Sequence, residues 1–490
     1  MGCLAIAVGQ DSSGMSDSPA SDTASSDRGP SNRHPLRQGL VRAGLVANAY
    51  RPLAGNPATF VPAFFASWVT SEAAPALLAT WTVRTVSQQL RRRRRGESLR
   101  PAEAAGLALT VAAGAGAVGL IRQGIRSDEE LSSALAPLVP ADELAERPAA
   151  VRAGALLPLL TGNRRRRRTR DVVFSDRDPD QPTSRRLKLD VYQPLDAPAP
   201  GERRPAVLQI HGGAWVLGSK NEQGIPLLNH LASAGWVGFN ADYRLSPNAK
   251  FPDHLVDLKR ALVWIREHAD EYGVDPNFIA VTGGSAGGHL CALMALTQND
   301  PAFQPGFEDA DTSVQAAVPF YGVYDLTDRE GDYHTGVPEK FSFTGLLAQL
   351  VMGVGVDESP EHWAAYSPID RVSADAPPTF VIHGDVDALV PVAGARRFVA
   401  KLRAASDQPV VYAELHGAQH AFEVFPSFRT VRTVEYVERF LHHVHAEYLA
   451  RTADPSATQP VPDGVDAEPL HADEVDDAAQ VRIEAAATAD

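Results

Sequence analysis

FIAVTGGSAGGHL, at residues 278–290, is the stretch that decides how this chain folds. It begins with a short apolar run, residues 278–282, which predicts a buried strand. Gly283-Gly284-Ser285-Ala286-Gly287 follows, and a strongly apolar helical stretch comes directly after it at residues 289–298. A G-x-S-x-G turn between a strand and a helix is the context in which a serine hydroxyl is held clear of a sheet. We therefore predict that Ser285 is a nucleophile.

The residues around Ser285 have their own physical reasons. Gly283 and Gly287 flank the serine because side chains there would clash where the strand and the helix fold back on each other. The helix behind the serine points free N–H groups and its positive dipole end at the reaction centre. The pentapeptide alone recurs by chance, so the prediction depends on partner residues elsewhere in the chain.

A serine hydroxyl needs a base to remove its proton, and the base needs an orienting carboxylate. In a strand–turn–helix arrangement of this kind these partners follow the serine in the order acid, then histidine. Two expected strands, 379–382 and 410–415, are followed by the loops HGDVDALVP (383–391) and HGAQHAF (416–422). Both loops lie at the carboxyl ends of strands, where ligands bind in such sheets.

Each loop offers two candidates. We choose Asp387 as the acid, because the pattern His-Gly-x-x-Asp-x-x-Val-Pro puts it in the usual acid position, and we expect Asp385 to bond the loop backbone. We choose His420 as the general base, and His416 is the alternative that we read as a surface or loop-packing residue.

The oxyanion of the reaction needs backbone donors fixed in place. His211-Gly212-Gly213-Ala214-Trp215 follows an expected buried strand, and the amides of Gly212 and Gly213 can approach a substrate because no side chain blocks them. The amide of Ala286, directly after the nucleophile, is a third predicted donor. We read His211 as a structural residue of this loop.

These motifs together carry a family resemblance. Residues 185–450 resemble the α/β-hydrolase superfamily, and within it the microbial carboxylesterases related to hormone-sensitive lipase and the feruloyl-esterase-like hydrolases. The resemblance rests on HGGAW, DYRLSPNAKFP running into HLVDLKRALVWI, GGSAGGHL, HGDVDALVP and HAF, in that order. It implies a serine carboxylesterase or lipase that forms an acyl-enzyme and needs no metal or other cofactor. Gly284, where Asp commonly precedes the serine, and Ala214, where a third Gly is usual, depart from the hormone-sensitive-lipase pattern.

The predicted fold class is α/β: an α/β-hydrolase fold whose mostly parallel central sheet is flanked by helices, with a helical N-terminal extension. Short apolar strands alternate with helical stretches through residues 171–451, the expected catalytic domain. The first two strands, 172–176 and 187–192, read as an antiparallel opening pair. Residues 327–371 interrupt the alternation and suit a cap, with Phe341, Phe343, Leu346, Leu347 and Trp363 as a candidate apolar lining.

Composition narrows the partners. The chain has 490 residues and a net charge of −14, yet residues 1–170 carry 22 Arg against 13 acids and the rest carries −23. An acidic catalytic part excludes nucleic acid as the main partner and leaves a small-molecule or lipid ester as the expected substrate. With Cys3 and Cys291 alone, no internal disulfide is expected, and Cys291 reads as a small buried hydrophobe.

Both ends of the chain have the composition of disordered segments. We expect residues 1–38 and 452–490 to be disordered, because residues 11–38 are rich in Ser, Asp, Pro and Gly and residues 452–490 are acidic and rich in Ala and Pro. The first ten residues, MGCLAIAVGQ, lack a basic region and fail the myristoylation pattern at Ile6. We therefore expect no cleavable export signal.

Residues 39–170 are open to two interpretations. Apolar stretches at 60–83, interrupted by Glu72 and Pro75, and at 104–121 are near the length that crosses a bilayer. The arginine run 91–95 lies between them. One interpretation is a membrane hairpin with the arginines on the cytoplasmic side, and the other is a helical accessory domain. A second run, 164–168, reads as a solvated linker or a contact with anionic lipid. The location is thus membrane-associated or cytoplasmic.

Alternatives remain for the function as well. A serine peptidase of the prolyl-oligopeptidase type also uses a G-x-S-x-G-G elbow, but residues 1–170 show no propeller-like repeats. A membrane scaffold with a secondary hydrolase domain is another, and a hydrolase fold that has lost activity is a third. Acyl chain length and oligomeric state are not encoded in any pattern that we recognise.

Overall fold

The computed structural model describes residues 34–53, 57–141, 144, 166–176, 186–199, 201–333, 338–425 and 427–453. Most of the predicted tail residues, 1–33 and 454–490, lie outside this set. Within it the first helix, α1 (His34–Tyr50), begins inside the segment predicted to be disordered. The last helix, α14 (Phe428–Ala453), likewise extends two residues past the predicted end of the catalytic domain.

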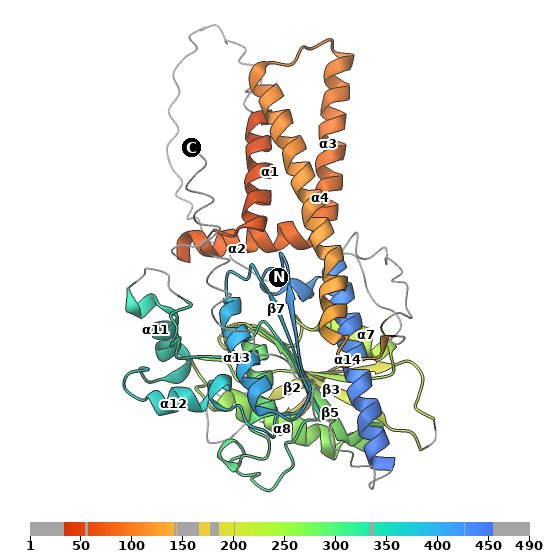
Figure 1. The fold of residues 1–490 in the computed structure, drawn as a ribbon, viewed down its shortest axis with the longest axis vertical. Helices are drawn as coiled ribbons and strands as arrows, with labels where there is room; N and C mark the ends of the chain where they lie inside the picture. Colours follow the sequence, from red (N-terminus) through yellow and green to blue (C-terminus); the bar gives the residue numbers. More distant parts are fainter. Residues whose placement is uncertain are drawn as a thin grey trace, which may run out of the picture.

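A mostly parallel sheet forms the centre of the C-terminal part (Figure 1). In the described part of the chain it has eight strands in the order β1-β2-β4-β3-β5-β6-β7-β8. The pairs β1–β2 and β2–β4 are antiparallel, as expected for the opening pair, and all later pairs are parallel. The bounds are β1 (Arg166–Ser175), β2 (Leu187–Pro194), β3 (Arg204–Ile210), β4 (Val237–Ala241), β5 (Val274–Gly284), β6 (Ala316–Phe320), β7 (Thr379–Gly384) and β8 (Val410–Leu415).

Helices cover both faces of this sheet, because alternate strand residues point to opposite sides. Leu208 of β3 joins a buried cluster with Leu258 and Leu290, whereas Val207 joins a second one with Leu228 and Phe440. The first cluster belongs to the face of α8 (Asp253–Glu267) and α10 (Ala286–Leu296), and the second to the face of α7 (Ile225–Ser233) and α14. Short α9 (Ala269–Tyr272) follows α8, and α13 (Val392–Ala405) packs against β7 and β8. The predicted α/β-hydrolase architecture is confirmed.

The structure contradicts the interpretation of the second arginine run, 164–168, as a solvated linker or lipid contact. Arg166, Arg167 and Arg168 are part of strand β1 and not of a linker. Arg168 donates from Nε to the buried carboxylate of Asp190 at 2.8 Å, and both Arg166 and Arg168 lie over the ring of Tyr192. Three of the five arginines therefore serve the sheet, and the reading as a solvated linker or lipid contact is wrong for them.

The N-terminal region contains, among the residues that the structure describes, the helices α1, α2 (Pro57–Glu72), α3 (Ala74–Arg94) and α4 (Pro101–Leu135). Helices α1 and α3 pack on α4 to form a bundle that rises from the hydrolase domain, and α2 lies across the base of that bundle (Figure 1). Gly39 and Gly106 let α1 and α4 approach closely, since a Cβ at Gly39 would lie 2.5 Å from the Gly106 carbonyl oxygen.

The apolar stretch 60–83 does not form a single membrane span, because the chain turns between α2 and α3.

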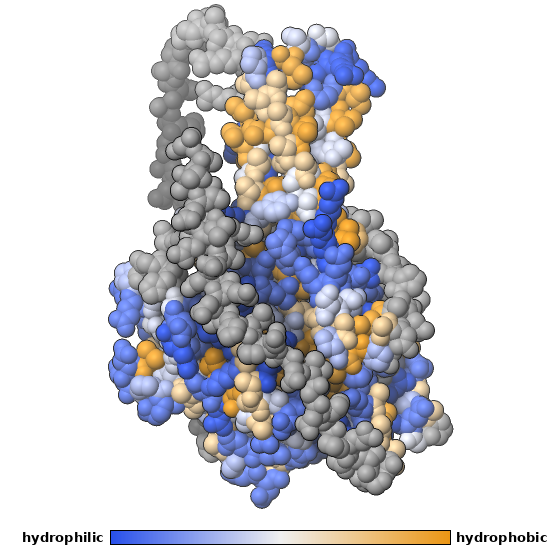
Figure 2. Space-filling view, in the orientation of Figure 1, coloured by the Kyte–Doolittle hydropathy of each residue, from blue (hydrophilic) through white to orange (hydrophobic). Residues whose placement is uncertain are grey.

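Apolar side chains on the bundle are exposed in large number (Figure 2). Helix α4 is long and apolar enough to cross a membrane, and only 22% of its most apolar window is buried. Its C-terminal half continues down to α14 and β8, which joins the bundle to the hydrolase domain. The exposed apolar residues of α1, α3 and α4 include Leu40, Val41, Val83, Val86, Leu90, Val111, Val118 and Ile125.

The segment after β6 that interrupts the alternation contains short helices in its described residues. It contains α11 (Phe343–Leu347) and α12 (Pro360–Ala365), which lie to one side of the domain in Figure 1. Trp363 and Leu347 belong to the hydrophobic core. They are therefore not part of an exposed apolar lining, whereas Phe341 and Leu346 are exposed.

Candidate active site

Ser285 stands at the strained turn between β5 and α10. Its backbone has φ 61° and ψ −124°, a conformation that non-glycine residues avoid and that clusters at functional sites. The turn is held on both sides: the Ser285 amide donates to the Phe320 carbonyl at 3.1 Å, and the His289 amide donates to the Ser285 carbonyl at 2.9 Å. The geometry is that of a nucleophile elbow.

Close packing explains the glycines of the elbow. A Cβ at Gly283 would collide with the backbone of Gly287, and a Cβ at Gly287 would collide with the backbone at Ile210. Gly284 has a different reason, because a Cβ there would lie 2.5 Å from the hydroxyl of Tyr321. Tyr321 therefore accounts for the absence of an acid before the serine.

Asp387 and His420 form a buried pair. His420 Nδ1 lies 2.7 Å from Asp387 Oδ2, and the other carboxylate oxygen accepts the amides of Leu389 at 2.9 Å and Val390 at 2.8 Å. His383 Nε2 lies 3.4 Å from the same Oδ2. Burial would raise the pKa of Asp387, but the charge of His420 and the hydrogen bonds from both histidines outweigh it and hold the pKa below its usual range. The carboxylate is thus kept ionised beside the imidazole.

The alternative pair is separate and more exposed. His416 Nδ1 lies 2.7 Å from Asp385 Oδ2, and the His416 side chain is 62% exposed. Asp385 Oδ1 accepts the Gly417 amide at 2.7 Å. The His416 amide in turn donates to Glu130 of α4 at 3.1 Å. This pair ties the loop after β8 to itself and to α4.

Tyr321 lies between the elbow and the histidine loop. Its ring centroid is 4.5 Å from that of His420, and its hydroxyl is the atom that a Cβ at Gly284 would meet. One buried side chain therefore contacts both the turn that carries the candidate nucleophile and the candidate base.

The glycine loop after β3 packs directly on Ser285. A Cβ at Gly212 would lie 2.9 Å from the Ser285 Cβ, so only glycine permits this approach. The Gly212 amide already donates to Gln223 Oε1 at 2.6 Å. Gly213 has φ +118°, which favours glycine. Ala286 is the first residue of α10, so its N–H has no helical carbonyl to bind.

Two further histidines near the elbow have structural partners. His211 Nδ1 lies 2.7 Å from the Gly212 carbonyl, and burial lowers the pKa of His211 to about 4. His289 Nε2 lies 2.7 Å from the Tyr366 carbonyl, and burial lowers its pKa to about 3. Both rings are neutral at pH 7 and support the loops around the serine.

Comparison with known proteins adds an independent line. The BD-FAE family model matches residues 189–402. The chain is 41% identical over 410 residues to a protein named probable carboxylic ester hydrolase LipM of Mycobacterium tuberculosis, which covers 81% of this chain and 90% of that protein. It is 43% identical to esterase LipQ of the same organism, over 61% of this chain and 69% of that one.

The chain belongs to the carboxylic ester hydrolases of the α/β-hydrolase fold. Among solved structures, the propionate-bound esterase 2 of Thermogutta terrifontis is 28% identical, with a TM-score of 0.47, and the match covers 58% of this chain and 96% of that one. The family also confirms that the protein is an enzyme acting on carboxylic esters, as the motifs predicted.

This carboxylic ester hydrolase has one site element that the sequence pattern did not reveal: helix α2. Trp68 Nε1 donates at 2.8 Å to the carbonyl of Ala421, the residue directly after His420. Gln419 Nε2 donates to Ser67 Oγ at 3.4 Å, while its Oε1 accepts the amides of Ala388 at 2.7 Å and His420 at 2.9 Å. The N-terminal region therefore contacts the loop of the candidate base.

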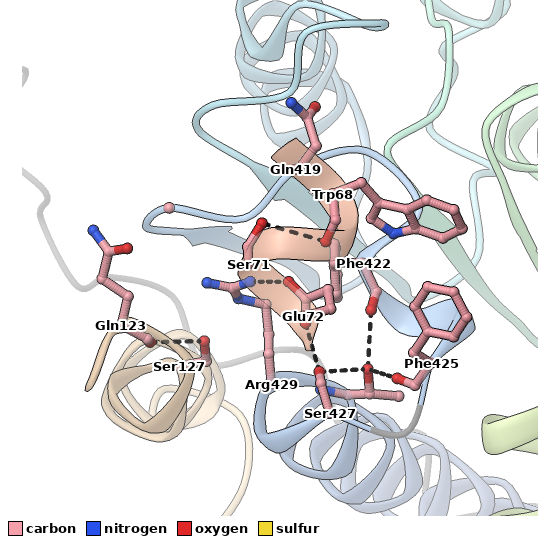
Figure 3. A network of polar contacts seen from close by, with 12 residues as sticks. Trp68, Ser71, Glu72, Gln123, Ser127, Gln419, Phe422, Phe425, Ser427 and Arg429 are labelled. Atoms are coloured by element: carbon pink, nitrogen blue, oxygen red, sulfur yellow. Dashed lines mark hydrogen bonds and ion pairs between the residues drawn. The ribbon is translucent and has the colours of Figure 1, made fainter. Parts of the chain in front are cut away.

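A buried ion pair anchors α2 to the hydrolase domain. Glu72, the last residue of α2, binds Arg429 of α14, and Ser427 Oγ donates to Glu72 Oε2 at 2.5 Å (Figure 3). The two side chains of the ion pair are 1% and 2% exposed. Trp68 adds a ring contact with Phe425, 4.7 Å between centroids.

Glu423 is a buried acid near the candidate base that the sequence pattern did not predict. The Tyr321 hydroxyl donates to Glu423 Oε2, and Glu423 is 4% exposed. Burial raises the pKa of Glu423 to about 7, against the opposing hydrogen bond from Tyr321. No local motif marks this residue, because its partner lies 102 positions away.

Proposed function

We propose that the enzyme hydrolyses carboxylic esters with Ser285 as nucleophile, His420 as general base and Asp387 as the orienting acid. The observation that carries this proposal is the buried 2.7 Å contact between His420 and Asp387, on a loop that Tyr321 links to the strained serine turn. The exposed Asp385–His416 pair lacks that link and has a separate role in the loop.

The steps follow from these roles. His420 takes the proton of Ser285 as its Oγ bonds to the ester carbonyl carbon, and Asp387 stabilises the imidazolium. His420 then gives the proton to the departing alcohol, which leaves an acyl-serine. Water, deprotonated by the same ring, attacks this ester and releases the carboxylic acid with the serine restored.

The oxyanion is stabilised by backbone amides in this proposal. Gly213 and Ala286 are the principal donors, because the Gly212 amide is bound to Gln223. Gly212 contributes mainly by its close approach to Ser285, which a side chain would prevent. We propose no metal or other cofactor.

The triad is tested by comparing two substitutions that remove the same charge. Asp387→Asn should lower kcat on p-nitrophenyl esters by about 10⁴-fold, because the imidazole loses its tautomer control and its counter-charge. Asp385→Asn is the matched control and should have a small effect. The reverse order of effects would assign the acid to Asp385.

We further propose that residues 39–170 hold the enzyme to a membrane, with residues 171–451 as the catalytic domain. Helix α4 is long and apolar enough to cross a bilayer, and only 22% of its most apolar window is buried. Apolar side chains are exposed on α1, α3 and α4 (Figure 2). The end of α3, whose last turn holds Arg91–Arg94, lies away from the hydrolase domain (Figure 1). By the positive-inside rule this end faces the cytoplasm, with the hydrolase domain on the opposite side.

The membrane also narrows the substrate in this proposal. Helix α2, at the base of the bundle, brings Phe64 within 6.3 Å of His420 between ring centroids and leaves Phe65 exposed. These aromatic side chains lie beside the base loop, on the side of the domain that faces the bundle. We therefore propose an ester with an apolar acyl chain as the substrate. The exposed Phe341 and Leu346 of the insertion after β6 offer further apolar surface.

A further inference from the structure

A polar cavity lies between α1, α3 and α4 at the end of the bundle away from the hydrolase domain. Its volume is about 300 Å³, and the residues around it include Gln38, Arg42, Thr85, Arg91 and Arg95. Helices α1 and α3 both pack on α4, and the cavity occupies the groove between them. It is separate from the candidate active site in every lining residue.

Arg42 is the residue that makes this cavity unusual. It is 7% exposed, and its Nη1 donates to Thr85 Oγ1 at 3.0 Å and Thr110 Oγ1 at 3.3 Å. Its guanidinium also lies over the ring of Trp81, 5.8 Å from the centroid. Within the described ranges no carboxylate lies within ion-pair distance of Arg42. A buried guanidinium without a counter-charge is unfavourable, so Arg42 favours an anion in the cavity.

The remaining charges of the cavity do not supply that partner. Arg91, Arg92 and Arg95 come from the last turn of α3 and its end. Glu103 binds Arg92 at 2.6 Å and accepts the Arg100 amide at 2.9 Å, so it is committed to the start of α4. Glu97 lies 3.8 Å from Arg95. Four arginines against two carboxylates leave the cavity with a net positive charge.

We propose that this cavity binds a phosphate group, and that in the bilayer the phosphate belongs to the headgroup of an anionic lipid. A guanidinium presents paired N–H donors that match phosphate oxygens, and four arginines line this cavity. The cavity lies at one end of a bundle whose exposed apolar side chains, in the proposed membrane arrangement, face the bilayer, so it lies at the level of the lipid headgroups. Free phosphate shares the same chemistry and is the competing source.

The test compares two double variants of equal charge on full-length protein in detergent. Arg91→Gln/Arg95→Gln removes two cavity arginines, and Arg93→Gln/Arg94→Gln removes two neighbours that do not line it. Affinity for short-chain phosphatidylglycerol, measured by titration calorimetry, should fall at least tenfold in the first and less than twofold in the second. Arg42→Gln, which keeps donors for Thr85 and Thr110, should behave like the first.

Further measurements distinguish a lipid headgroup from free phosphate, and a specific site from diffuse attraction. Phosphatidylcholine should bind much more weakly than phosphatidylglycerol, and inorganic phosphate should compete only weakly. Equal losses in both double variants would overturn the site in favour of diffuse attraction. Tighter binding of inorganic phosphate than of the lipid would overturn the lipid assignment. The lipid assignment rests on the proposed membrane association, whereas the phosphate site does not, because binding is measured in detergent. Ester hydrolysis is measured in parallel, so a failure of the proposed triad is seen separately.

Discussion

Glu423, whose carboxyl is buried, directly follows Phe422, the last residue of the base loop. Tyr321 contacts both Glu423 and His420. Burial keeps this acid protonated to a higher pH than an exposed glutamate. Ionisation of Glu423 therefore places a buried charge next to Tyr321, which contacts the candidate base His420.

Glu423→Gln tests this titration. The folded pKa is about 7 and the ordinary value is 4.5, so the stabilisation from the protonated acid is fully present below pH 4.5 and is lost as the pH rises through 7. The difference is on the order of 3 kcal/mol. Glutamine keeps the shape but cannot ionise, so the Tm of the variant should change less between pH 5 and pH 8 than that of the wild type. An unchanged pH dependence would show that Glu423 is not the titrating group.

Chain order is the information from which the sequence predicts the three candidate triad residues. Ser285, Asp387 and His420 each follow a strand that is apolar enough to be recognised, and parallel strands bring their carboxyl ends to one edge. Gln223 and Tyr321 were not predicted, since their contacts with Gly212 and Gly284 are set by packing of distant segments.

At the scale of elements, helix α2 is the part of the N-terminal region that matters to the site. It contributes Ser67, Trp68 and Glu72 to contacts with the histidine loop and with α14. Glu72 is visible in the sequence as an interruption of the apolar stretch 60–83. Its role is not visible there, because it pairs with Arg429, a partner 357 positions away that no local pattern shows.

Removing one member of this buried pair should be costly. Glu72→Gln leaves Arg429 without its counter-charge, and such a change costs about 3–5 kcal/mol. We expect a lower Tm and a lower kcat, because α2 detaches from the loop that carries His420. Asp270→Asn, at an exposed pair with Arg203, is the control and should cost less than about 1 kcal/mol.

A second variant separates charge from packing. Glu72→Leu combined with Arg429→Met removes both charges and should recover much of the lost Tm, since apolar replacements of a buried pair are often neutral. Loss of Tm without any change in kcat would mean that α2 does not position the histidine loop.

At the scale of the whole molecule, the protein combines a hydrolase domain with an apolar helical bundle, and α4 runs from one to the other. The hydrolase fold was predictable because its strands alternate with helices over a long stretch. The bundle was predictable only as helix, because an Ala-rich and Gly-rich sequence fits a membrane span and an accessory domain equally well.

Alkaline carbonate extraction of membranes, from cells that express the full-length protein, distinguishes a membrane span from an accessory domain. A bundle that spans the bilayer should keep the protein in the membrane pellet, and detergent should release it. Recovery in the carbonate supernatant would show that the bundle packs on protein and not in lipid.

The central claim, that Ser285 carries the acyl group, is tested most directly by covalent labelling. The purified protein is treated with diisopropyl fluorophosphate and digested, and the peptides are analysed by mass spectrometry, with Ser285→Ala as the control. We predict one diisopropylphosphoryl group on Ser285, loss of esterase activity in proportion to labelling, and no labelling of the variant. Stoichiometric labelling of another residue, or equal labelling of Ser285→Ala, would contradict the assignment.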